Sequence, residues 1–250
     1  MKRNVENVVI AGAGIMGASF AQIFAKYKYN VVVYDNSAES IQKGKQLIKL
    51  NQAELISSGD LTEEESQEIL SRISFTLDMK CFAEADFVLE AIIENMDIKK
   101  VFWEKVSRSV DEDIVLASNT SGLSITEMAT VIKNPERFCG MHWVNPPHIV
   151  PLVEIISGEK TVDETLEIVW DISKSLHRKP IMVKKDAKGF VLNRLQYAVL
   201  REALYIVENG IASMDDVDNV MKYGLGMRYA AIGPFETVDL GGLDTFRMIA

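Results

Sequence analysis

Short apolar runs alternate with amphipathic stretches through most of the chain, and this alternation stops near residue 185. The apolar runs, which are typical of strands buried on both faces of a sheet, cover residues 5–11, 30–34, 85–93, 114–118, 138–142, 152–156 and 180–183. Helical periodicity fills the intervals, which predicts an α/β fold with a Rossmann-type, doubly wound and mostly parallel sheet. We therefore expect an α/β domain at 1–185 and a smaller all-helical domain at 186–250.

Charge, cysteine content and hydropathy restrict the partners and the compartment of this 250-residue chain. A net charge of −9 argues against nucleic acid or an anionic membrane surface as the main partner. No run approaches the roughly 18 apolar residues of a membrane span, and residues 1–5 precede the first strand without the apolar segment of a signal peptide. Cys81 and Cys139 have neither metal-binding nor disulfide spacing. We expect a cytoplasmic protein that binds a small molecule and holds no metal.

The first apolar run leads directly into a G-x-G-x-x-G loop that opens a helix. In this pattern the first glycine permits a tight turn, the second lets backbone approach a pyrophosphate, and the third lets helix and strand pack closely. The helix N-terminus attracts the negative charge. We expect a dinucleotide to be held by Gly12, Gly14, Ile15, Met16 and Gly17.

Asp35 ends the second apolar run, about twenty residues after the glycine loop. A carboxylate at this place accepts hydrogen bonds from both ribose hydroxyls of the adenosine half and repels a 2′-phosphate. The next residue is Asn36 instead of an arginine that would attract that phosphate. The domain at 1–185 is therefore predicted to bind NAD in preference to NADP.

A second candidate site lies where two apolar runs flank a proline-rich loop. His142 ends the run 138–142, and Glu154 lies inside the run 152–156. If the runs pair as neighbouring strands, the imidazole and the carboxylate meet, which is the usual construction of a general base. Imidazole, with an ordinary pKa of about 6.5, both accepts and returns a proton near neutral pH. A histidine on an apolar run is more often a core residue, but the carboxylate and the Asn-Pro-Pro loop favour catalysis here.

Ser121 follows the run 114–118 in a short polar loop. Small polar residues just past the carboxyl ends of parallel strands face the ligand crevice of such sheets. We expect Ser121 to contact the substrate or the nicotinamide, although serine in a loop is by default a turn former.

Further motifs run from the first strand to the last residues. They are Glu94-Asn95 with Lys99, Ser118-Asn119-Thr120-Ser121, His142 with Asn145-Pro146, Leu152-Val153-Glu154, Gly189-Phe190 with Asn193-Arg194, and Gly233-Pro234 with Asp239 and Gly241-Gly242-Leu243-Asp244. Together with the glycine loop, in this order and spacing, they resemble the 3-hydroxyacyl-CoA dehydrogenase family. The resemblance implies NAD-dependent interconversion of (S)-3-hydroxyacyl-CoA and 3-oxoacyl-CoA, on a short chain such as 3-hydroxybutyryl-CoA, by a homodimer.

The resemblance also implies a role for each matching residue. His142 would be the general base that takes the hydroxyl proton as hydride leaves the substrate carbon, and Glu154 would hold the imidazole. Ser121 and Asn193 would hydrogen-bond the reacting oxygen. Asp35 would lie on the adenosine side of the cofactor, and the nicotinamide-ribose side would be lined by Glu94, Lys99, Asn119 and Asn145.

Several positions depart from the acyl-CoA branch of the family and leave the substrate open. That branch commonly has His-Phe-Phe-Asn-Pro where this chain has residues 142–146 as His-Trp-Val-Asn-Pro, and Glu54 falls near the place of a CoA-associated lysine. The second domain is more similar to the lambda-crystallin or L-gulonate 3-dehydrogenase branch. There Arg228 could bind a free substrate carboxylate, or it could be a solvated or interface arginine. An NAD-binding protein of the crystallin kind without turnover is the third interpretation.

The resembling family continues for several helical residues beyond the point where this sequence stops. The second domain is accordingly short. We expect either that its helices pack mostly against a partner subunit, or that the sequence is a shortened form.

Overall fold

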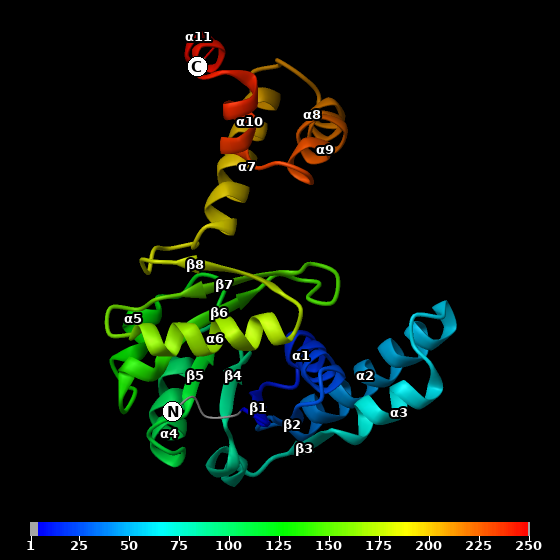
Figure 1. Ribbon diagram of the computed structural model, residues 1–250, viewed down its shortest axis with the longest axis vertical. Coiled ribbons are helices and arrows are strands. Elements are labelled where there is room, and N and C mark those ends of the chain that lie inside the picture. The colour runs from blue at the N-terminus through cyan, green and yellow to red at the C-terminus, as the bar shows by residue number, and fades with distance from the viewer. Residues whose placement is uncertain (1–4, 250) are drawn as a thin grey trace. The chain divides into compact units, whose positions relative to one another are not determined.

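The computed structural model describes residues 5–249, which contain one sheet of eight strands (Figure 1). The strands are β1 (Asn7–Ala11), β2 (Asn30–Tyr34), β3 (Ile73–Thr76), β4 (Phe87–Glu90), β5 (Val115–Ser118), β6 (Phe138–Trp143), β7 (Leu152–Ile156) and β8 (Lys179–Val183). Their spatial order is β3-β2-β1-β4-β5-β6-β7-β8, and each neighbouring pair is parallel except β6 with β7. Residues 1–4 and 250 of the expected domains lie outside the described residues.

Helices fill the crossovers between the parallel strands. They are α1 (Ile15–Lys26), α2 (Ala38–Ser58), α3 (Glu63–Ser71), α4 (Met96–Ser109), α5 (Ile125–Ala129) and α6 (Asp163–Ser175), with the 3-10 helices η1 (Met79–Glu84) and η2 (Pro135–Arg137). Local sequence explains several of their limits. Ser37 and Thr62 accept hydrogen bonds from first-turn amides as N-caps of α2 and α3, and Gly59 ends α2 with a φ of 82°, which glycine adopts without strain.

The helices cover both faces of the sheet. Phe24, Ile48 and Val169 bring α1, α2 and α6 into one apolar cluster, whereas Trp103 and Met128 bring α4 and α5 into a second cluster. Because both faces are covered, the central strands are apolar at nearly every position instead of at alternate ones.

The order in which the chain adds strands to the sheet reverses between β1 and β4. From β1 the chain proceeds outward to β2 and β3, and it then returns to form β4 and β5 on the other side of β1. In open α/β sheets the ligand crevice lies outside the carboxyl ends of the strands at such a reversal. The loops that follow β1, β4, β5 and β6 therefore border the expected ligand crevice.

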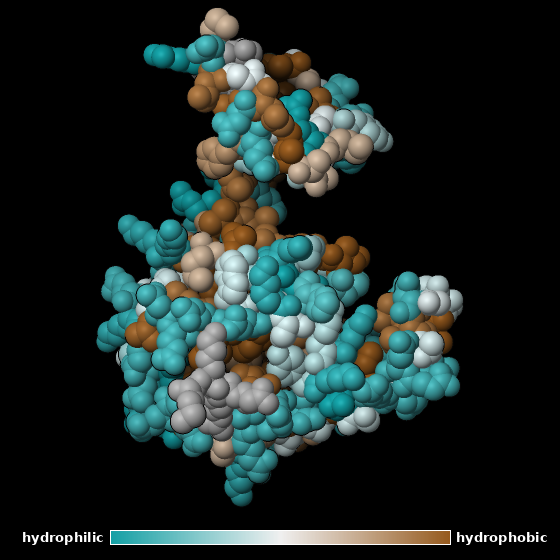
Figure 2. Space-filling view, viewed as in Figure 1, coloured by the Kyte–Doolittle hydropathy of each residue, from teal (hydrophilic) through white to brown (hydrophobic). Residues whose placement is uncertain are grey.

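Contacts divide the chain into two compact units, residues 1–193 and residues 194–250. The helices after β8 are α7 (Leu192–Glu208), α8 (Met214–Val220), the π-helix η3 (Met221–Leu225), α9 (Gly226–Tyr229), α10 (Pro234–Gly241) and α11 (Leu243–Ile249). No residue of α7, α8, α9 or α10 is buried. Figure 2 shows apolar side chains on the surface of the second unit.

The predicted fold class, a doubly wound and mostly parallel sheet followed by a helical domain, is confirmed. The first compact unit continues to Asn193, beyond the expected boundary at 185. Contacts made by the connecting segment explain the difference. Asp186 accepts hydrogen bonds from Ser124 Oγ at 2.6 Å and from the Thr126 amide at 2.8 Å, which fastens the connecting segment to α5.

Candidate active site

His142 and Glu154 lie directly opposite each other on β6 and β7. The antiparallel register pairs them, and Nδ1 of the imidazole is 2.7 Å from Oε2 of the carboxylate. His142 is 5% exposed and Glu154 is fully buried. The ring of Phe190 packs against the imidazole with 5.6 Å between the ring centroids. The prediction that two strands bring this pair together is confirmed.

The second oxygen of Glu154 holds the start of α7. Oε1 accepts hydrogen bonds from the backbone amides of Val191 and Leu192, each at 2.9 Å. The carboxylate is therefore fixed from two sides. It cannot rotate away from the imidazole without losing the two hydrogen bonds from backbone amides. It has two functions, because it orients His142 and caps a helix.

These contacts also decide where the imidazole carries its proton. Burial alone would raise the pKa of Glu154, but hydrogen bonds from His142 and from the Leu192 and Val191 amides lower it below the ordinary value of 4.5. An ionised carboxylate only accepts hydrogen bonds, so Nδ1 of His142 is the donor. With Nδ1 engaged by Glu154, Nε2 is the acceptor of a neutral ring.

Ser121 and Asn193 lie beside each other at the crevice edge. The side-chain amide of Asn193 donates to the backbone carbonyl of Ser121 at 2.8 Å. The backbone amide of Ser121 donates to Glu94 Oε1 at 2.8 Å, and the hydroxyl of Thr120 donates to the same oxygen at 2.6 Å. The Ser121 side chain itself is exposed. The structure therefore fixes the backbone of Ser121 and leaves its hydroxyl on the surface of the crevice.

Asn119 joins the Ser121 loop to the strand that carries the histidine. Its side-chain oxygen accepts a hydrogen bond from the backbone amide of Trp143 at 2.8 Å. Asn145, two residues beyond β6, is exposed in the loop to β7. Trp143, one of the positions that departs from the acyl-CoA pattern, is 2% exposed and packs against Phe20 with 5.2 Å between the ring centroids. That departure therefore changes core packing.

The glycine loop has the features required to bind a pyrophosphate. Gly12 has a φ of 107°, and a Cβ on Gly17 would lie 1.8 Å from the Gly12 carbonyl oxygen. Both glycines are thus required by the fold. Gly14 differs, because a Cβ there would meet no atom within 4 Å. Open space at Gly14, together with a helix start at Ile15 that has no side-chain cap and no acidic residue in its first turn, fits an anionic ligand.

Asp35 lies at the end of β2 beside this loop. Its Oδ2 accepts a hydrogen bond from the Ala13 amide at 2.8 Å, and its Oδ1 accepts one from the Ser37 amide at 2.9 Å. Each carboxylate oxygen has a further lone pair. Both oxygens therefore keep acceptor capacity for the two ribose hydroxyls.

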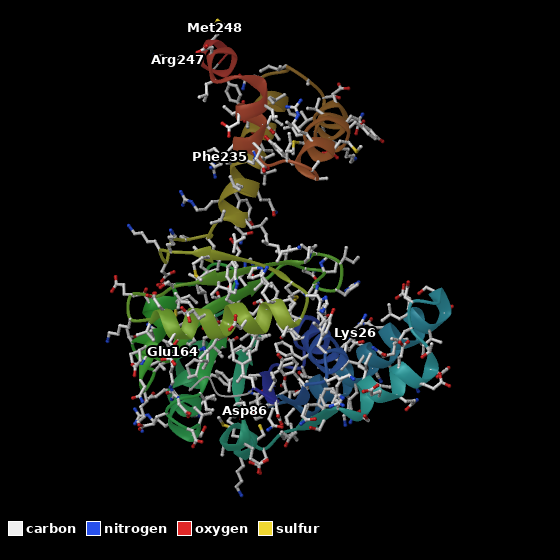
Figure 3. All side chains as sticks on the ribbon, in the orientation of Figure 1. Lys26, Asp86, Glu164, Phe235, Arg247 and Met248 are labelled. Atoms are coloured by element: carbon white, nitrogen blue, oxygen red, sulfur yellow. The ribbon has the colours of Figure 1, made fainter. Side chains whose placement is uncertain are left out.

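Lys99, which is expected to line the nicotinamide-ribose side together with Glu94, is buried next to that residue. It is 1% exposed, and its ammonium lies 2.5 Å from Glu90 Oε1 and 3.4 Å from Glu94 Oε2. Glu90 is fully buried at the carboxyl end of β4. Asp86, labelled in Figure 3, precedes the amino end of the same strand. Glu90 is not among the site residues predicted from the sequence. The signal for it in the sequence is a carboxylate within an otherwise apolar run.

Arg228 belongs to α9 in the unit formed by residues 194–250, and its side chain is exposed. Within the described part of the chain, no group of three or more His, Cys, Asp or Glu side chains is arranged to hold a metal ion. No helix among residues 5–249 is long and apolar enough to cross a membrane.

A dinucleotide loop at the sheet reversal and a buried imidazole–carboxylate pair at the same edge define an NAD-dependent dehydrogenase. The chain belongs to the 3-hydroxyacyl-CoA dehydrogenase family. The NAD-binding domain of that family matches residues 7–187, and its C-terminal domain matches residues 189–250. NAD is the cofactor.

Three relatives with different names are similarly close. A probable 3-hydroxybutyryl-CoA dehydrogenase from Deinococcus radiodurans is 39% identical over 236 residues, covering 94% of this chain and 83% of the relative. A lambda-crystallin homolog from Rattus norvegicus is 37% identical over 235 residues, covering 93% and 74%. The crystal structure of 5-formyl-3-hydroxy-2-methylpyridine 4-carboxylic acid 5-dehydrogenase, an NAD+-dependent dismutase, has a TM-score of 0.88 at 35% identity, covering 98% and 79%.

Proposed function

We propose that the chain oxidises a short (S)-3-hydroxyacyl-CoA, such as 3-hydroxybutyryl-CoA, to the 3-oxoacyl-CoA and catalyses the reverse reduction. The observation that carries this proposal is the buried pair of His142 and Glu154, in which Nδ1 is engaged and Nε2 is left as an acceptor. An imidazole in this state removes a hydroxyl proton. The similarity to a probable 3-hydroxybutyryl-CoA dehydrogenase supports the choice of substrate class.

Proton transfer and orientation are the work of the chain's own residues. Bound NAD supplies the hydride acceptor. Nε2 of His142 takes the proton of the 3-hydroxyl group as the hydride leaves the carbon that bears this hydroxyl group. Glu154 stabilises the imidazolium that results. The Ser121 hydroxyl and the second amide hydrogen of Asn193 hydrogen-bond the reacting oxygen, so that its developing carbonyl is held in line with Nε2.

The residues present fit the cofactor on both of its halves. Gly14 and the start of α1 would hold the pyrophosphate, and Asp35 would bind the adenosine ribose. Glu94, Lys99, Asn119 and Asn145 would line the nicotinamide-ribose side.

A free hydroxy acid is the second candidate substrate. It is favoured by the similarity to a lambda-crystallin homolog and by Glu54 near the expected place of a CoA-associated lysine. In this alternative, an L-gulonate 3-dehydrogenase type of reaction, Arg228 would bind the substrate carboxylate. A binding protein without turnover is disfavoured, because it would need the glycines and Asp35 but not the His142–Glu154 pair.

We also propose that the chain forms a homodimer through the second unit. The 17-residue helix α7 is amphipathic, yet none of its residues is buried in the single chain. Leu195 is 57% exposed and Leu204 is 52% exposed. Apolar surface of this extent marks an interaction face. Light scattering of the purified protein tests the proposal, and a monomer with a fully folded helical unit would contradict it.

A substrate panel monitored by NADH absorbance tests the proposed reaction. The panel contains 3-hydroxybutyryl-CoA, a longer 3-hydroxyacyl-CoA and L-gulonate, each with NAD, and acetoacetyl-CoA with NADH for the reverse direction. We expect the highest kcat/KM with 3-hydroxybutyryl-CoA. A higher kcat/KM with L-gulonate would support the second candidate. Saturable NADH binding without turnover of any member of the panel would contradict both.

A further inference from the structure

Phe190 has a backbone conformation that is unusual for a large side chain. Its φ is 47°, in the left-handed region that favours glycine. Within residues 5–249, three other non-glycine residues have a positive φ, and none of them is buried: Lys28, Asn134 and His177. Phe190, in contrast, is only 2% exposed. A costly conformation at a buried aromatic residue persists only where the surrounding structure requires it, and such positions are commonly functional.

Hydrogen bonds on both sides of Phe190 fix this conformation. Before the ring, the Phe190 amide donates to the Ala187 carbonyl at 2.9 Å and closes a turn. After it, the amides of Val191 and Leu192 both donate to Glu154 Oε1, each at 2.9 Å. Consecutive amides next to a left-handed residue point to the same side and form a concave site for an anion. The positive φ of Phe190 therefore directs two amides at one carboxylate oxygen.

The ring of Phe190 lies against the other member of the pair. Its plane is inclined at 57° to the imidazole of His142, with 5.6 Å between the centroids. A ring in this place opposes rotation of the imidazole, which would turn Nε2 to a new direction. It also keeps water from the 2.7 Å hydrogen bond between His142 Nδ1 and Glu154 Oε2, and a bond to a charged group is stronger where water is excluded.

Packing alone is a poor explanation for Phe190. The ring belongs to the apolar cluster that contains Phe138 and Trp103. Phe138 is fully buried in that cluster from ordinary extended backbone, with a φ of −110°. An aromatic residue thus fills this core without a left-handed conformation. What extended backbone would not supply is a ring on His142 together with two amides on Glu154.

We infer that Phe190 is a positioning residue for the proposed base. Its left-handed backbone aims two amides at Glu154, and its ring holds the plane of the His142 imidazole and shields the bond between the two side chains. The inference rests on the proposed role of His142 in the dehydrogenase reaction. Phe190 acts through the imidazole–carboxylate pair and not on the reacting atoms.

Phe190→Leu and Phe138→Leu form a matched pair of variants of the full chain. Both remove a buried ring from the same cluster, but the Phe138 ring packs against Trp103, with 5.0 Å between centroids. We expect similar losses of Tm. We expect kcat to fall about 10- to 100-fold in Phe190→Leu, as for a misplaced reacting group, with an unchanged Kd for NADH, and Phe138→Leu to change neither. Equal effects on kcat, or an unchanged kcat in Phe190→Leu, would overturn the inference.

Proton NMR of the His142 Nδ1–H group gives a readout that needs no substrate. A proton between an imidazole and a carboxylate resonates far downfield and is visible only while its exchange with water is slow. Phe190→Gly removes the ring, and glycine adopts the same φ without strain. We expect the resonance in wild type and in Phe138→Leu, and its loss through faster exchange in Phe190→Gly. Its absence from wild type, or its persistence in Phe190→Gly, would overturn the role of the ring.

Hydrogen exchange of the Val191 and Leu192 amides tests the backbone. Phe190→Gly and Phe190→Ala both lack the ring, but only alanine is strained at a positive φ. We expect both amides to keep their protection in Phe190→Gly and to exchange faster in Phe190→Ala. Equal protection in the two variants would overturn the role of the backbone.

These measurements distinguish a failure of the inference from a failure of the proposed function. Turnover by wild type, together with a persistent His142 resonance in Phe190→Gly, would leave the proposed function intact and overturn only the role of Phe190. Loss of the resonance in Phe190→Gly, with no member of the substrate panel turned over, would support the positioning of the pair and count against the proposed reaction.

Discussion

The two sides of the crevice are built by opposite means. At the turn between β1 and α1 the site consists of backbone and of missing side chains: Gly14 is open, and the helix start is uncapped. Between β6 and β7 it consists of two buried side chains, His142 and Glu154, with both carboxylate oxygens held by hydrogen bonds. The turn between β1 and α1 offers a ligand space and backbone amide hydrogens, whereas the β6–β7 side offers the lone pair of His142 Nε2.

This difference predicts different consequences of substitution. A change on the open side should alter the affinity for the cofactor and leave the chemical step of bound enzyme nearly intact. A change on the closed side should lower kcat and leave the affinity for the cofactor intact. The following variants test this separation.

The largest effect is expected for His142→Gln. The variant removes the group that accepts the hydroxyl proton, and a positioned general base is worth about 100- to 10,000-fold in rate. We expect kcat to fall by that range while the Kd for NADH, measured by fluorescence titration, stays near the wild-type value. A variant that retains wild-type kcat with 3-hydroxybutyryl-CoA and with L-gulonate would contradict the proposed base.

A smaller loss is expected for Glu154→Gln. The glutamine oxygen can still accept the Val191 and Leu192 amides, but its NH2 group then faces Nδ1 and favours the wrong tautomer of His142. The carboxylate partner of a metal-bound histidine is typically worth about 10- to 100-fold in activity, and we expect the same range for the partner of His142. We expect kcat to fall within that range with an unchanged Kd for NADH. Glu154→Asp, which keeps the charge but shortens the side chain, should restore part of the activity only if charge is the larger factor.

On the open side, Gly14→Ala and Gly17→Ala should separate affinity from folding. A Cβ on Gly14 meets no protein atom within 4 Å, so we expect normal Tm and a Kd for NADH roughly tenfold higher, or about 1.4 kcal/mol. A Cβ on Gly17 would lie 1.8 Å from the Gly12 oxygen, so overpacking should destabilise the fold by about 1–3 kcal/mol. The separation would fail if Gly14→Ala lowered Tm as much as Gly17→Ala.

Much of this comparison was predictable from sequence, because both sides leave a local pattern. The glycine spacing predicts the turn, and two apolar runs flanking a loop predict the pairing that brings His142 to Glu154. The amides of Val191 and Leu192 were not predictable. They lie 37 and 38 positions from Glu154, and a backbone donor leaves no mark in the sequence. By contacts, these amides belong to the first unit, which ends at Asn193.

Lys99 shows a second limit of sequence reasoning. Its position one helical turn after Glu94-Asn95 predicts that it lies near the cofactor, and in the structure its Nζ is 3.4 Å from Glu94 Oε2. Spacing does not determine whether the side chain points into solvent or into the core. Lys99 points into the core because it forms an ion pair with Glu90. In the sequence, Glu90 is a single polar residue in a buried strand and does not indicate this partner. A charged residue at the carboxyl end of such a strand is therefore a reason to look for a partner on the next helix.

The smallest expected effect concerns the pH dependence of stability on the closed side. The contacts of Glu154 hold its pKa below the ordinary 4.5, so the folded state binds this proton more weakly than the unfolded state does. The carboxylate therefore stabilises the fold at pH above 4.5, and this contribution is lost as pH falls below that value and through the folded pKa. Urea unfolding should show that wild type has a larger free energy of unfolding than Glu154→Gln. We expect this difference to become smaller as the pH is lowered.

A control is needed because other carboxylates titrate in the same range. Glu65, whose pKa is lowered by its hydrogen bonds with the backbone and side chain of Thr62, is exposed on α3, so solvent screens its contribution. Glu65→Gln should therefore leave the pH dependence of stability close to that of wild type. A gap for Glu154→Gln that stays constant down to acidic pH would mean that Glu154 stabilises the fold through shape alone. The charge of Glu154 would then serve only to orient His142. It would make no contribution of its own to the free energy of unfolding.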